Sequence, residues 1–69
     1  MKLTVNGIEE SLAAESVTVS GLLDELKVVD ALYVTVELNG EILKRENFVR
    51  TIVSDGDAVE FLYFMGGGA

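Results

Sequence analysis

Two Asn-Gly dipeptides restrict the possible folds of this 69-residue chain more than any other feature of its sequence: Asn6-Gly7 and Asn39-Gly40. Both central residues of a type I′ turn need a positive φ, which asparagine and glycine tolerate, and such turns join antiparallel strands. The segments beside each dipeptide have strand-like composition: residues 2–5 and 8–12 around the first, and residues 33–38 and 41–43 around the second. The sequence therefore predicts two β-hairpins, with the acidic residues 8–12 at a sheet edge.

The segment between the two hairpins has the period of a helix. Its apolar residues fall at i, i+3, i+4 and i+7, on one helical face: Val19, Leu22, Leu23 and Leu26. Thr18 is the expected N-cap, with Ser20 as a second candidate, and residues 13–16 are expected to form a loop. Gly21 is expected to cost about 1 kcal/mol relative to alanine. A helix this short must pack its leucines against a sheet.

The rest of the chain predicts a short strand over residues 51–53 and a final strand over residues 58–65, joined by a turn in which Gly56 adopts positive φ. A single helix packs naturally across one face of a sheet. The helical connection between the hairpins also allows the first and last strands to lie parallel in the middle. We therefore expect an α+β, β-grasp (ubiquitin-like) fold with a mixed sheet of four to five strands. Residues 1–65 would form the domain and residues 66–69 a flexible glycine tail.

The composition excludes several classes of function. The chain contains no histidine and no cysteine, so it offers no imidazole base, disulfide or transition-metal cluster. Its net charge of −7 argues against binding nucleic acid. Apolar runs are too short for a membrane span and no signal peptide is visible, so a cytoplasmic location is expected. Asp55 and Asp57 are interpreted as turn residues and not as a metal or acid–base pair.

The chain closes with Gly66-Gly67-Gly68-Ala69. This is no phosphate-binding loop, because neither a helix nor a Lys-Ser or Lys-Thr pair follows it. A glycine run without side chains can thread through a narrow tunnel into another protein's active site. A terminal carboxylate there can be adenylated and then attacked by a sulfur or amine nucleophile. The glycine run alone is also compatible with an inert terminus.

The whole chain resembles the ThiS sulfur carriers of thiamin biosynthesis, within the ThiS/MoaD group of ubiquitin-like proteins. Five segments carry the resemblance: residues 3–7, the helix with Thr18-Val19, Leu22-Leu23 and Leu26, residues 34–42, residues 55–61, and residues 64–68. Their order, spacing and short total length are together specific. Molybdopterin-synthase subunits of the same group are usually longer, which favours ThiS.

The resemblance implies a carrier and not an enzyme. Gly67 and Gly68 fall on the terminal diglycine of the family. Gly68 would be adenylated by a ThiF-like E1 adenylyltransferase and converted to a thiocarboxylate that delivers sulfur to a ThiG-like thiazole synthase. ATP and a sulfur donor would be used by the partner, with no cofactor bound by the chain itself, which is expected to be a monomer when free. The alternatives are a MoaD-like carrier for molybdopterin or another thiocarboxylate pathway, and an inert β-grasp interaction module.

The chain departs from the family pattern at three positions. Ala69 follows the diglycine, so a protease is expected to remove it and expose Gly68. Lys44 and Phe48 stand where the family tends to carry a proline and a tryptophan, and Phe48 can fill the same apolar role.

The final strand is partly apolar on both faces, although a single helix covers only one. Leu62 and Phe64 would then form an exposed patch that, with Gly66, binds the partner. The alternative is a fully buried strand shielded by loops such as the one that holds Phe48.

Overall fold

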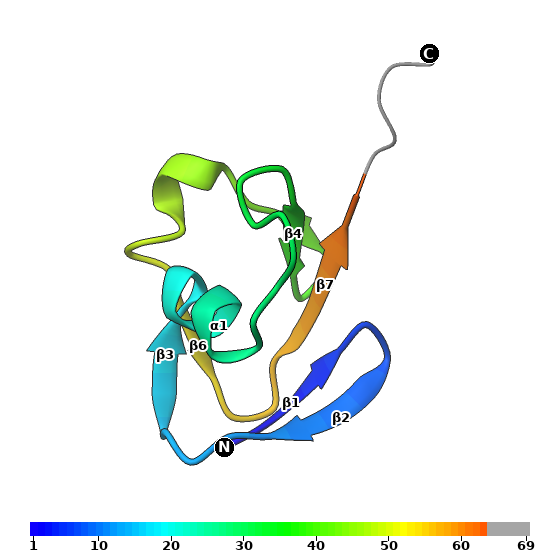
Figure 1. The fold of residues 1–69 in the computed structure, drawn as a ribbon. Helices are drawn as coiled ribbons and strands as arrows, with labels where there is room; N and C mark the ends of the chain where they lie inside the picture. The colour runs from blue at the N-terminus through cyan, green and yellow to red at the C-terminus, as the bar shows by residue number, and fades with distance from the viewer. Residues whose placement is uncertain (64–69) are drawn as a thin grey trace.

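A computed structural model describes residues 1–63 of the chain. This part forms a five-stranded sheet, a two-stranded sheet, one α-helix and one 3-10 helix (Figure 1). In chain order the elements are β1 (Lys2–Val5), β2 (Ile8–Ser11), β3 (Ser16–Thr18), α1 (Val19–Glu25), β4 (Thr35–Leu38), β5 (Glu41–Ile42), η1 (Arg45–Asn47), β6 (Ile52–Ser54) and β7 (Ala58–Leu62).

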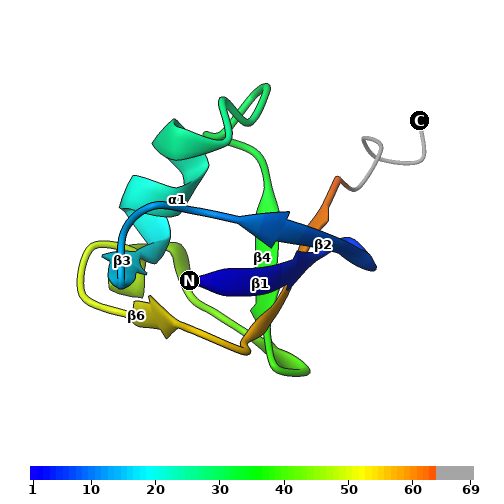
Figure 2. The same ribbon diagram turned by 90° about the horizontal axis from the view of Figure 1, so that it is seen from below.

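The larger sheet has the order β2-β1-β7-β4-β5. Its central strands β1 and β7 are parallel, with Val5 opposite Val59, whereas β7 and β4 are antiparallel. Figure 2 shows α1 and the β3–β6 pair to one side of this sheet. The predicted α+β, β-grasp arrangement is therefore confirmed, including the parallel central pair and the edge position of β2.

Both Asn-Gly dipeptides form the predicted hairpin turns. The φ angles are 52° and 83° at Asn6 and Gly7, and 52° and 88° at Asn39 and Gly40. All four are positive, as a type I′ turn requires. Gly56, with φ of 89°, occupies the third predicted turn.

The helix α1 begins after the predicted cap, since Thr18 Oγ1 accepts a hydrogen bond of 3.0 Å from the Gly21 N–H. Ser20 lies inside the helix and is not the cap. The expected cost of Gly21 relative to alanine leaves out a steric contact that the structure shows. A Cβ at this position would lie 2.7 Å from Val17 Cγ2, closer than carbon atoms can pack. Gly21 therefore lets the helix approach β3.

The two-stranded sheet was only half predicted. The sequence indicated β6, but the loop expected over residues 13–16 is wrong at its end, because Ser16 begins β3. The pair is antiparallel, with Val17 opposite Val53. Three residues are too few to show a strand period, which explains why β3 was missed.

The hydrophobic core lies between α1 and the inner face of the larger sheet. It includes Val19, Leu22 and Leu23 of the predicted helical face, whereas Leu26 of that face is only partly buried. It also includes Phe48, which is only 4% exposed. The buried residues are Leu3, Val5, Val19, Leu22, Leu23, Val34, Val36, Phe48, Val53 and Val59. Phe48 thus confirms its predicted role as an apolar anchor.

The last strand is shorter than predicted in its described part. β7 ends at Leu62, and Tyr63 already lies outside the strand. The predicted strand end at Met65 and the boundary between domain and tail lie beyond residue 63, outside the described residues. Within residues 1–63, no helix is both long and apolar enough to cross a membrane.

Candidate functional site

The central strand β7 is held by the two asparagine turns at its sides. The Asn6 N–H donates to the Val59 carbonyl at 2.9 Å, and Asn6 Oδ1 accepts from the Phe61 N–H at 2.8 Å. On the opposite side, Asn39 Oδ1 accepts from the Ala58 N–H at 2.9 Å. From the sequence, both asparagines were predicted only as turn residues. Asparagine also supplies a side-chain oxygen, which is the signal for this second role.

The outer face of β7 is the face that α1 does not cover. Alternation along the strand puts Val59 and Phe61 toward the core, so Glu60 and Leu62 point outward. Leu62 lies opposite Thr35 and is half-buried. Its observed environment is therefore intermediate between the exposed patch and the shielded position that the sequence left open. Phe64, the other predicted member of the patch, lies outside the described residues.

Two glutamates stand opposite each other beside Leu62. Glu37 of β4 pairs with Glu60 of β7, and on its other side Glu37 pairs with Ile42 of β5. Ile42 is 65% exposed. Directly opposed like charges weaken a pair of strands. This outer face therefore combines partly exposed apolar side chains with concentrated negative charge.

Tyr63 leaves the end of β7 on the core side of the sheet, following the alternation of Val59 and Phe61. Its hydroxyl donates a hydrogen bond of 2.6 Å to the carbonyl of Val29. Val29 belongs to the loop between α1 and β4, residues 26–34, which we term the connecting loop. No role was predicted for Tyr63 from the sequence, because a contact between residues 34 positions apart leaves no local sequence pattern.

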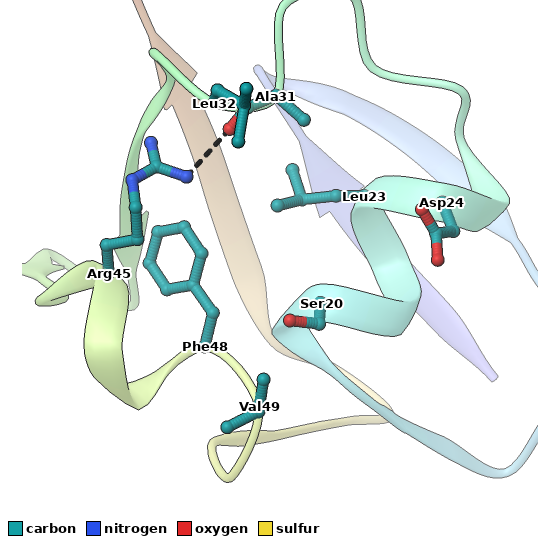
Figure 3. Close-up of a pocket in the computed structure, with 8 residues that line it drawn as sticks. All are labelled: Ser20, Leu23, Asp24, Ala31, Leu32, Arg45, Phe48 and Val49. Carbon is teal, nitrogen blue, oxygen red and sulfur yellow. Dashed lines mark hydrogen bonds between the residues drawn. The ribbon is translucent and has the colours of Figure 1, made fainter.

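The connecting loop borders a hollow of about 350 Å³ between α1 and η1 (Figure 3). Arg45 of η1 donates to the carbonyls of Ala31 and Val34, at 2.8 Å and 2.6 Å. Its guanidinium lies 5.1 Å from the centre of the Phe48 ring. Arg45 thus fastens the connecting loop to the segment that carries Phe48.

The acidic turn before β7 has a structural role. Asp55 Oδ1 accepts from the Lys2 N–H at 2.7 Å, and Asp57 Oδ2 accepts from the Ser54 N–H at 2.8 Å. Asp57 Oδ1 also accepts from Asn39 Nδ2 at 3.1 Å. These bonds confirm the interpretation of both aspartates as turn residues. Among residues 1–63, no group of three or more acidic, histidine or cysteine side chains is placed to hold a metal.

The predicted carrier residues Gly67 and Gly68, the partner-binding Gly66 and the terminal Ala69 lie outside the described residues. The described residues include the two that precede this C-terminal segment, at the end of the central strand of the sheet. Leu62 lies on one face of the sheet and Tyr63 on the other.

This arrangement defines a ubiquitin-like β-grasp domain whose central strand leads toward a glycine-rich C-terminal segment. The chain belongs to the ThiS family, whose model matches residues 3–68. It is 65% identical to a thiamine biosynthesis protein (ThiS) from Geobacter metallireducens. The crystal structure of that protein superposes with a TM-score of 0.94, over 99% of this chain and all of the other. The solution structure of a Geobacter metallireducens thiamine biosynthesis protein gives a TM-score of 0.80 at 64% identity, over all of this chain and 90% of that one.

A curated relative extends the comparison to a larger protein. A thiazole synthase of Paramagnetospirillum magneticum is 45% identical over 69 residues, which is the whole of this chain. The match covers 21% of that protein, so the chain spans about a fifth of the length of this relative.

Proposed function

We propose that this chain is a sulfur carrier for thiazole formation in thiamin biosynthesis. A ThiF-like E1 adenylyltransferase binds the chain, and the carboxylate of Gly68 attacks the α-phosphorus of ATP, with release of pyrophosphate. Sulfide-level sulfur from a donor then attacks the acyl carbon, and AMP leaves. The product is a thiocarboxylate, which a ThiG-like thiazole synthase consumes. ATP and the sulfur donor belong to the partners, so the chain is a carrier rather than a catalyst.

The observation that carries this proposal is the ThiS family match, which extends through all three glycines to Gly68. The fold supports it, because the strand that precedes the glycines is the central one and is hydrogen-bonded on both sides. The match of the whole chain to part of a thiazole synthase supports a ThiG-like enzyme as the acceptor. We propose that the carrier meets these two partner enzymes in the cytoplasm.

Gly67 and Gly68 form the carrier end of the proposed tail. Glycines suit this role, because they have no side chains that would obstruct a narrow tunnel to the adenylation site. Gly68 has no carboxylate while its carbonyl is bonded to Ala69. We therefore propose that a protease first removes Ala69. An intact mass spectrum of the sulfurated protein from its native cells should show the chain ending at Gly68.

The outer face around Leu62 is the proposed docking surface for the adenylating enzyme. We propose that Leu62 acts there together with Phe64 and Gly66. The glutamates at positions 37 and 60 suit a partner surface with basic groups. Apolar contact would supply affinity, and the charges would orient the encounter.

A reconstitution experiment tests the carrier function. The chain with and without Ala69 is incubated with a ThiF-type enzyme, ATP and a sulfide donor, and its intact mass is measured. The form that ends at Gly68 should gain the mass difference between sulfur and oxygen, and the longer form should not. Addition of a thiazole synthase with its substrates should return the mass to that of the carboxylate. An unchanged mass for both forms would mean that the chain is an inert interaction module.

A further inference from the structure

The conformation of the connecting loop is fixed by its own hydrogen bonds and by contacts with neighbouring elements. Two of its residues adopt left-handed backbone conformations, Lys27 with φ of 53° and Asp30 with φ of 55°. Non-glycine residues rarely adopt this conformation unless the surrounding structure fixes it. Within the loop, the Tyr33 N–H donates to the Asp30 carbonyl at 2.8 Å.

The loop is fastened at two further places. The Val28 N–H donates to the Leu23 carbonyl at 3.0 Å, which joins the loop to α1. Arg45 bonds two carbonyls of the same loop, and Arg45 itself lies against the buried Phe48 ring. Figure 3 shows Arg45 reaching Ala31 across the hollow. The carbonyl of Val29 therefore belongs to a segment that is anchored on both sides.

The Tyr63 hydroxyl bonds to this anchored segment at the point where β7 ends. The ladder between β4 and β7 ends at the pair of Thr35 and Leu62, so the sheet no longer holds the next residue. The bond to Val29 is short, at 2.6 Å, although the Tyr63 side chain is 48% exposed. Hydrophobic burial therefore contributes less than usual to its position, and the hydroxyl contributes more.

We propose that Tyr63 is a positioning residue that fixes where the C-terminal segment leaves the domain, using the connecting loop as its support. This inference rests on the proposed carrier function and extends it to a residue within the described part of the chain. A fixed starting point lowers the entropy lost when a partner captures the segment. After capture the partner holds the segment itself, so the bond to Val29 should affect docking and not the chemical step.

The test uses Tyr63→Phe, which removes only the hydroxyl. The matched control is Tyr33→Phe, in the same loop, where the side chain is 77% exposed. Both variants are made in the chain that ends at Gly68, and pyrophosphate release by a ThiF-type enzyme is followed as the carrier concentration varies. Tyr63→Phe should raise the KM for the carrier about three- to tenfold with little change in kcat. Tyr33→Phe should match the parent chain.

A second measurement needs no partner. Hydrogen exchange of the backbone amides near the Thr35–Leu62 end of the ladder should accelerate about three- to tenfold in Tyr63→Phe, while exchange at Val59 stays constant. Unchanged exchange overturns the inference whatever the function of the chain. Faster exchange with an unchanged KM also overturns it, because the bond would then be structural only. If the parent chain is not adenylated at all, the carrier function fails, and exchange alone decides whether Tyr63 holds the end of β7.

Discussion

Asn6 and Phe61 are 55 positions apart in the chain, yet the Asn6 side-chain oxygen accepts a hydrogen bond of 2.8 Å from the backbone N–H of Phe61. Asn6 also forms the first hairpin turn, with φ of 52°. One residue thus sets the turn between β1 and β2 and holds the parallel neighbour of β1. The same pairing of roles occurs at Asn39, which bonds Ala58 on the other side of β7.

Substitution of Asn6 should separate these two roles. Asn6→Gly keeps the positive φ but removes the acceptor for the Phe61 N–H, and we expect the free energy of unfolding to fall by about 1 kcal/mol. Asn6→Asp keeps both an acceptor oxygen and tolerance of positive φ, so it should lie close to the parent chain. Urea denaturation followed by circular dichroism measures both. If Asn6→Gly has the same free energy of unfolding as the parent chain, this hydrogen bond does not contribute to stability.

Gly21→Ala should destabilise the protein, although alanine is the better helix former by about 1 kcal/mol. The new Cβ would meet Val17 Cγ2 at 2.7 Å, and relief of such crowding in a packed region typically costs about 1–3 kcal/mol. Thermal and urea unfolding measure the difference.

The double variant Val17→Ala with Gly21→Ala is the matched control, because it removes the methyl group that the new Cβ would strike. It should be more stable than the sum of the two single effects predicts. Simple additivity would show that the contact with Val17 is not the cause.

Features that depend on neighbouring residues were predicted from the sequence, and features that depend on contacts between distant residues were not. The Asn-Gly turns, the cap at Thr18 and the buried face of α1 each depend on residues close together in the chain, and each was predicted. The strand β3 has only three residues and exists because Val17 meets Val53. No local sequence pattern predicts such a pairing of distant strands.

The site shows the same division between local and distant information. The apolar pattern on both faces of the final strand predicted that Leu62 lies on the face that the helix does not cover. The bond from Tyr63 to Val29 and the fork from Arg45 to Ala31 and Val34 depend on how the connecting loop folds back. Two left-handed residues shape that loop, and neither is a glycine that would have marked the position in the sequence.

Removal of one charge from the Glu37–Glu60 pair should stabilise the sheet. Glu60→Gln keeps the size of the side chain and relieves the cross-strand repulsion, so we expect a gain of about 0.2–1 kcal/mol in the free energy of unfolding. Salt screens charges at exposed positions, and the gain should therefore shrink at high ionic strength. Urea titrations at low and high sodium chloride measure it. Glu9→Gln, on the edge strand β2, is the control for the change in net charge.

Leu62→Glu should weaken binding to a ThiF-type enzyme while the fold is retained. The side chain is half-buried on the outer face, and loss of its apolar contact should raise the Kd about tenfold. Ile52→Glu makes the same chemical change at a 51% exposed position on β6, in the smaller sheet, and should bind normally. Calorimetric titration gives the Kd, and circular dichroism confirms folding. Normal binding by a folded Leu62→Glu variant would contradict the proposed docking surface.

Arg45 should act on the base of the C-terminal segment without touching it. Arg45→Met keeps the apolar stem beside Phe48 and removes the two hydrogen bonds to the connecting loop, which should lower the free energy of unfolding by about 1–2 kcal/mol. Arg45→Lys keeps the charge but not the planar fork, so it should restore only part of the loss. Arg50→Met, at an exposed position just beyond η1, is the control and should change stability little.

A double variant of Arg45 and Tyr63 tests the supporting role of Arg45 more directly than stability does. If Arg45 supports the loop that receives the Tyr63 hydroxyl, loosening the loop already removes most of the benefit of that hydrogen bond. Arg45→Met should therefore raise the KM for the carrier in the adenylation assay, and adding Tyr63→Phe should then raise it much less than in the parent chain. If the two substitutions instead raise the KM by independent factors that multiply in the double variant, Tyr63 is positioned without help from Arg45. The conformation of the connecting loop would then be held by interactions within residues 26–34.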